Sequence, residues 1–131
     1  MRSGIDFEIV RQVGLAMPGV EEGGAHGARA LRVRGKLLAC EPTHRLAEPG
    51  SLVVKLADED RAALLAEAPN VYYLPDHYVD FNSVLVRLSR MGPDELRDLL
   101  GMAHKFVTHK APERVALLKR GRIRKGKSTR S

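Results

Sequence analysis

Short runs with apolar residues at alternate positions constrain the fold of this chain most. Such runs are typical of strands that bury one face, and they are too short to form independent helices. The predicted strands span residues 28–34, 36–41, 51–56, 71–74 and 82–89. The first two are joined by the tight link Arg34-Gly35-Lys36, and hairpin-scale connections of this kind favour an antiparallel sheet.

Three other segments carry apolar residues at three- or four-residue steps and predict helices over 6–17, 58–68 and 93–110. Asp6 and Asp58 are expected to cap the first two helices, and Pro93 suits the first turn of the third. The predicted order is α-β-β-β-α-β-β-α. We therefore expect a two-layer α+β domain, with helices on one face of an antiparallel sheet.

The segment between the first helix and the sheet is acidic and rich in glycine. Pro18-Gly19 ends the helix, and the sequence predicts a turn that holds Glu21 and Glu22. Here a structural hinge is favoured over a phosphate-binding loop with His26 as donor. Neither a Walker spacing nor a dinucleotide fingerprint is present.

The positive charge of the chain is concentrated at its C-terminal end. The 131 residues have a formal net charge of +6, yet residues 1–118 carry 15 basic and 16 acidic side chains. We expect a domain over residues 1–112 and a basic, disordered tail over 113–131. The basic residues at its end are Lys119, Arg120, Arg122, Arg124, Lys125, Lys127 and Arg130.

Several classes of protein do not fit this sequence. One cysteine, Cys40, allows no internal disulfide, and no apolar run suits a signal peptide or a membrane span, so a cytoplasmic location is expected. The five histidines show no metal-ligand spacing, and Cys40 resembles a small buried residue more than a nucleophile. We expect no enzyme activity, no metal and no cofactor.

Strand alternation assigns four basic residues to the sheet face opposite the helices. These residues are Arg32, Arg34, Lys55 and Arg87, and Val53 and Leu85 are expected beside them. Charges on such a face commonly keep it solvated, and this explanation is favoured. The alternative is a surface that binds phosphate groups or an acidic partner.

The stretch 76–82 contains His77, Tyr78, Asp80 and Asn82, which could line a small-molecule pocket. A polar loop before a strand is the commoner explanation for such residues.

An ordered series of segments resembles the MmcQ/YjbR family of small bacterial proteins. The series runs through "MPGVEEG", "LRVRGKLLA", "LVVKLADEDRAALLAE", "YYLPDHYVDFNSVLVRL" and "DELRDLLGMAHKFV", and covers residues 5 to about 110. The resemblance implies a fold likened to type III secretion chaperones and to a double-wing DNA-binding domain. The stretch "VDFNSV" lacks the tryptophan that many relatives carry there.

Together these features predict a non-enzymatic DNA-binding module that contacts the phosphate backbone through the tail and in part through the sheet. A protein-binding or chaperone-like module is the alternative, and a small-molecule-binding domain ranks third. The sequence leaves open whether the chain is a monomer or a homodimer.

Overall fold

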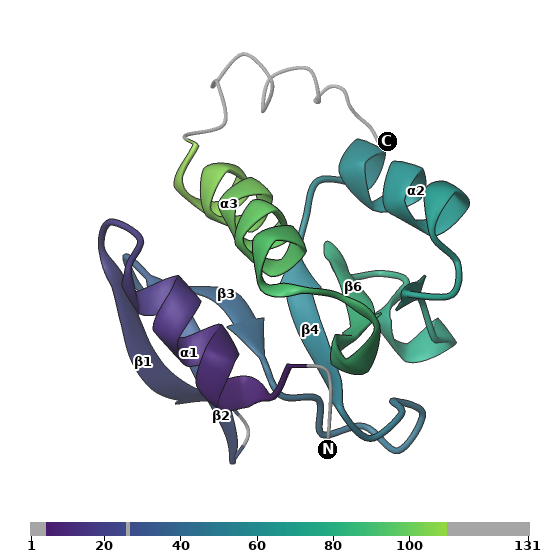
Figure 1. The fold of residues 1–131 in the computed structure, drawn as a ribbon, viewed down its shortest axis with the longest axis horizontal. Coiled ribbons are helices and arrows are strands. Elements are labelled where there is room, and N and C mark those ends of the chain that lie inside the picture. Colours follow the sequence, from purple (N-terminus) through teal and green to yellow (C-terminus); the bar gives the residue numbers. More distant parts are fainter. Residues whose placement is uncertain (1–4, 26, 110–131) are drawn as a thin grey trace.

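The computed structural model describes residues 5–25 and 27–109, which form one open sheet and three helices (Figure 1). The predicted α+β class and order of elements are confirmed, with one strand more at the start of the sheet. The elements are α1 (Phe7–Leu15), β1 (Val20–Ala25), β2 (Ala28–Val33), β3 (Lys36–Cys40), β4 (Ser51–Lys55), α2 (Asp58–Glu67), β5 (Tyr72–Tyr73), β6 (Ser83–Arg87) and α3 (Pro93–Thr108). Two short 3-10 turns, Asp76–Tyr78 and Leu88–Arg90, flank β6.

The six strands pair in the order β1-β2-β3-β4-β6-β5, and every pairing is antiparallel. The prediction that Glu21 and Glu22 lie in a turn is wrong, because both belong to β1. Glu21 pairs with Arg32 and Glu22 with Leu31. Gly23 and Gly24 have low β-propensity, so the local sequence does not indicate a strand here. The segment forms a strand because it pairs with β2.

A two-residue turn joins β2 to β3. Arg34 and Gly35 have φ angles of 55° and 78°, and Val33 pairs with Lys36 on either side of them. Two successive positive φ values match the twist of a tight hairpin, and Gly35 adopts this conformation without steric cost. The turn leaves Arg34 and Lys36 exposed at the tip of the hairpin.

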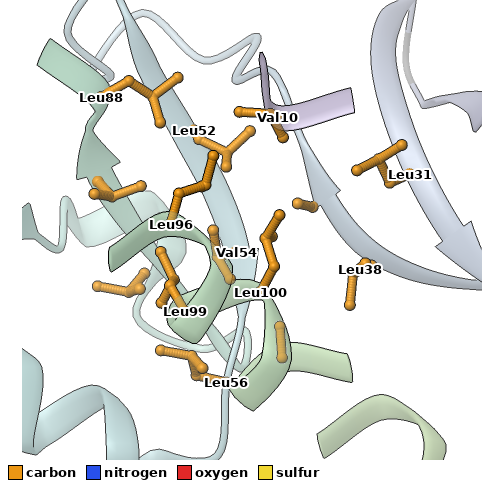
Figure 2. Close-up of a cluster of buried hydrophobic side chains, with 14 of the residues drawn as sticks. Val10, Leu31, Leu38, Leu52, Val54, Leu56, Leu88, Leu96, Leu99 and Leu100 are labelled. Carbon is orange, nitrogen blue, oxygen red and sulfur yellow. The ribbon is translucent and has the colours of Figure 1, made fainter. Parts of the chain in front are cut away.

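The main core lies between one sheet face and helices α1 and α3 (Figure 2). Leu52 and Val54 of β4 meet Leu96, Leu99 and Leu100 of α3 there. The predicted phase of the strands is therefore confirmed. Helix α2 has no fully buried residue, and it lies beside β5 with Leu64 and Leu65 packed against the edge of this core.

The helix ends show how local sequence sets the boundaries. Asp6 caps α1 as predicted, because its carboxylate accepts a hydrogen bond from the Ile9 amide at 3.2 Å. The corresponding prediction for Asp58 is wrong. Ala57 is the cap residue of α2, and Asp58 is the first helical residue, where its charge still favours the helix N-terminus.

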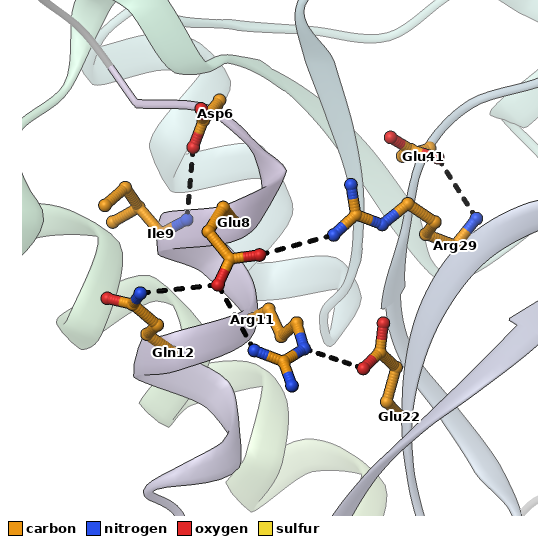
Figure 3. Close-up of polar contacts among 8 residues, drawn as sticks. All are labelled: Asp6, Glu8, Ile9, Arg11, Gln12, Glu22, Arg29 and Glu41. Carbon is orange, nitrogen blue, oxygen red and sulfur yellow. Dashed lines mark hydrogen bonds and ion pairs between the residues drawn. The ribbon is translucent and has the colours of Figure 1, made fainter.

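Ion pairs fasten α1 to the strands beneath it (Figure 3). Arg11 contacts Glu22 of β1 at 2.7 Å and Glu8 at 3.2 Å, and Glu8 also contacts Arg29 of β2 at 3.6 Å. The Glu41 carboxylate accepts a hydrogen bond from the Arg29 amide at 3.1 Å. These links fix the outer strands to the helix layer.

None of the helices in the described ranges is both long and apolar enough to span a membrane.

Candidate functional site

Loops cover the sheet face that lies opposite the helices. A second, smaller core on this face contains Ala30, Cys40, Val53, Tyr78 and Leu85. Val53 is 5% exposed and Leu85 is fully buried, so the prediction that they lie on an open surface is wrong. The covering segments, residues 41–50 and 74–82, are far apart in sequence, and local patterns do not reveal that they close over the strands.

The four basic residues assigned to this face have separate surroundings. The Arg32 guanidinium donates to the backbone oxygens of Gly24 and Gly35, at 3.2 and 3.3 Å, and supports both hairpins. Arg34 lies in the exposed turn, outside the strand alternation. Lys55 is half-buried and lines a cavity, described below. They do not form one continuous basic surface.

Arg87 is held in a network of its own. Its guanidinium contacts both carboxylate oxygens of Glu48 at 2.8 and 2.9 Å, donates to the Asn70 oxygen at 3.1 Å and stacks over the Tyr73 ring at 4.3 Å. The hydrogen bond from Arg87 lowers the pKa of Glu48. This arrangement joins the loop 41–50 to the end of β6, and it occupies the donors that a phosphate group would need.

The stretch 76–82 borders the same cavity that Lys55 lines, between the second sheet face and its covering loops. Two of the four residues predicted there belong to the cavity lining. His77 and Tyr78 line it, together with Phe81. Asn82 instead donates a hydrogen bond to the Asp58 carboxylate at 2.8 Å, and Asp80 is exposed outside the lining. The stretch therefore forms one wall of a pocket.

Two residues that the sequence did not single out contact this wall from outside the cavity. The His44 ring stacks on His77 at a centroid distance of 3.9 Å, although the two lie on different loops. Arg61 of α2 donates to the backbone oxygens of Val79, Phe81 and Ser83 and so fixes the segment in place. Neither contact has a sequence signal, because both join residues from segments without a shared local pattern.

Cys40 and the histidines were the other residues considered for catalysis or metal binding. Burial raises the pKa of the Cys40 thiol, which disfavours its nucleophilic form. Within residues 5–25 and 27–109, no three histidine, cysteine, aspartate or glutamate side chains come together as a metal site would require. His104 contacts the backbone oxygen of Pro18 at 2.7 Å through Nε2 and tethers α3 to the start of β1.

One end of the fold gathers exposed cations. Arg34 and Lys36 flank the β2–β3 turn, Val33 beside them pairs with Val20, and the contact between His104 and Pro18 brings the last turns of α3 to the same end. Lys105 is exposed on those turns. The seven basic residues from Lys119 to Arg130, like the predicted domain boundary at residue 112, lie outside the described residues.

The fold and these sites define a small α+β domain with a loop-covered pocket on one sheet face. Residues 15–106 match the YjbR family, and the chain belongs to this family. The crystal structure of the Deinococcus radiodurans protein DR2400, which contains a DUF419 domain, has a similar fold with a TM-score of 0.66. The two chains share 20% sequence identity, and the similarity covers 91% of this chain and 89% of that chain. A search of curated proteins gave no match.

Proposed function

We propose that this YjbR-family protein is a non-enzymatic DNA-binding protein that holds the phosphate backbone through its C-terminal basic segment. The observation that carries the proposal is the separation of charge along the chain. Residues 5–25 and 27–109 hold 12 basic and 15 acidic side chains, whereas residues 110–131 hold nine basic and one acidic. Nonspecific affinity for DNA comes largely from such phosphate contacts.

The end of the fold that carries Arg34, Lys36 and Lys105 supports the proposal. It lies beside the last turns of α3, and α3 is the last described element before the basic segment in the sequence. Glu21 is the nearby opposing charge on β1. Phosphate contacts from this end would position the domain on a duplex without any requirement for base recognition.

The test is a DNA-binding titration of the full chain and of a variant lacking residues 119–131, at several salt concentrations. Each phosphate neutralised contributes about −0.9 to the slope of log affinity against log salt. Deletion should therefore weaken binding and flatten the slope by several units. A matched variant, Arg34→Gln with Lys36→Gln, should show a smaller loss and a slope change of up to about 2. Unchanged affinity and salt dependence after deletion would refute the proposal.

One observation favours protein binding as the second candidate function. Leu46, Val79 and Phe81 are 49%, 44% and 48% exposed, and all three belong to the loops that cover the second sheet face. Exposed apolar side chains on neighbouring loops are typical of surfaces that bind a peptide or another protein. This function would be supported if a Val79→Ser variant binds a peptide or a second copy of the chain more weakly than the wild type does, while its affinity for DNA is unchanged.

A further inference from the structure

A cavity of about 210 Å³ opens between the second sheet face and its covering loops. Its floor comes from β3, β4 and β6, and its rim comes from residues 41–43 and from His77, Tyr78 and Phe81. The volume is below the range of about 300–1,000 Å³ that is common for pockets of drug-sized ligands. The cavity therefore suits a small molecule.

Lys55 brings a positive charge into this cavity. Its side chain is half-buried, and the ion pairs of the described residues do not include it. Its ammonium nitrogen lies 5.9 Å from the centre of the Phe81 ring. Burial lowers the pKa of Lys55, as expected for a cation with too little compensation. An anionic group beside Lys55 would provide the missing counter-charge.

Ser83 provides a second, independent feature. It is 1% exposed, pairs with Lys55 across the β4–β6 ladder and lines the cavity on the same face as Leu85. Its hydroxyl has no hydrogen-bond partner among residues 5–25 and 27–109. Because buried hydroxyls are nearly always hydrogen-bonded, this group has an unused donor at the cavity floor.

Most of the remaining lining is apolar or uncharged. Phe81 lies at the rim, with its ring centroid 5.8 Å from that of His77, and Val53 and Leu37 contribute aliphatic surface. Burial and then His77 lower the pKa of His44, which disfavours the charged form of the ring that stacks on His77. The thiol of Cys40 stays protonated because burial raises its pKa.

One carboxylate also lines the cavity. Glu41 accepts the Arg29 amide hydrogen bond on the side of β2, and it is half-buried. Its charge disfavours ligands with several negative charges, such as phosphate groups, more than it disfavours a single carboxylate. The cavity thus combines one cation, one hydroxyl donor and a flat aromatic rim.

We propose that this cavity binds a small aromatic monocarboxylate, with its carboxylate on the Lys55 ammonium and the Ser83 hydroxyl and its ring against Phe81 and His77 at the rim. The proposal does not rest on the proposed DNA contacts, because none of Arg34, Lys36 and Lys105 lines the cavity. Two polar groups fix the anion, and the rim selects a planar body.

The test uses benzoate as the probe and the full chain, with binding followed by calorimetry and by amide chemical shifts in NMR spectra. A ligand of this size should bind with a dissociation constant of about 1 mM or below, and shifts should centre on residues 40–43, 53–55 and 77–83. Benzamide, which keeps the ring and lacks the charge, should bind at least about tenfold more weakly.

Variants identify the groups involved. Lys55→Met should weaken benzoate binding by about tenfold or more, and Ser83→Ala should weaken it severalfold. Arg97→Met removes an exposed cation of α3 outside the cavity and should leave binding unchanged. Thermal unfolding of each variant checks that the fold is retained. If Lys55→Met does not fold, Ser83→Ala and the benzamide comparison decide the question.

Three results would overturn the proposal. The first is no binding at about 10 mM benzoate, well above the expected dissociation constant. The second is equal affinity for benzamide and benzoate. The third is that benzoate shifts the amide signals of residues elsewhere in the fold, or that folded Lys55→Met and Ser83→Ala variants bind benzoate as tightly as the wild type does.

Discussion

Arg61 should contribute more to stability than its position on the most weakly packed helix implies. Its side chain is 14% exposed and donates to the backbone oxygens of Phe81 at 2.6 Å, Ser83 at 3.1 Å and Val79 at 3.3 Å. These contacts join α2 to the segment that forms the pocket wall. We predict that Arg61→Met, which keeps much of the aliphatic stem, lowers the free energy of unfolding.

The size of the effect follows from the three hydrogen bonds. Each is worth about 0.5–1.5 kcal/mol net, and more where the donor is charged and the acceptor is removed from water. The Phe81 and Val79 oxygens are in exposed hydrogen bonds and regain water in the variant, whereas the hydrogen bond to the Ser83 oxygen is partly buried. The expected loss is about 2–3 kcal/mol, or a decrease in Tm of about 10 °C for a domain of this size.

Thermal and urea unfolding of the two proteins measure this difference. Arg97→Met is the matched control, because Arg97 is 61% exposed and forms a single ion pair with Asp94 at 2.9 Å. Such a surface pair contributes about 0.5 kcal/mol or less. If Arg61→Met and Arg97→Met unfold at the same temperature, the hydrogen bonds from Arg61 do not stabilise the segment and the argument is wrong.

Three further predictions concern the fold. Leu100→Ala should lower the free energy of unfolding by about 2–5 kcal/mol in urea titrations, because the side chain is fully buried between α3 and the sheet. Gly35→Ala should destabilise the β2–β3 turn by about 1 kcal/mol, whereas Gly101→Ala, at an open site in α3, should stabilise by a similar amount. Arg87 lowers the pKa of Glu48 below its ordinary 4.5, so their pair stabilises the fold above that pH and loses this effect as the pH falls through the lowered pKa. The stability difference between wild type and Glu48→Gln should therefore shrink in acid unfolding curves, and a constant difference would contradict the role of the pair.

Local patterns predicted the helices and most strands, because their determinants lie within a few residues. Asp6 can cap only the helix that follows it, and Val54 must face the same side as Leu52. The strand β1 escaped prediction because its glycines lower β-propensity, and its order depends on pairing with β2.

The candidate site was predicted less completely than the fold. Alternation correctly placed Lys55 opposite the helices, but it could not show that distant loops bury Val53 and Leu85 on that face. A pocket at 76–82 was the less favoured alternative to a polar loop, and two of its four residues, His77 and Tyr78, line the cavity. The contacts of His44 and Arg61 with this segment became visible only when the chain was folded. Such contacts depend on the whole topology and not on local spacing.

The use of loops instead of helices to cover the second sheet face has a consequence for how such domains diverge. Helices α1 and α3 hold the larger core, so changes there disturb the whole domain. Loops tolerate substitution and changes in length more readily than the elements they connect. A lineage could therefore alter the chemistry of the covered pocket by exchanging residues of 41–50 and 74–82 while the sheet and its helices keep their arrangement. Among related domains, the residues on the helix side would then stay similar, and the residues of the covering loops would differ.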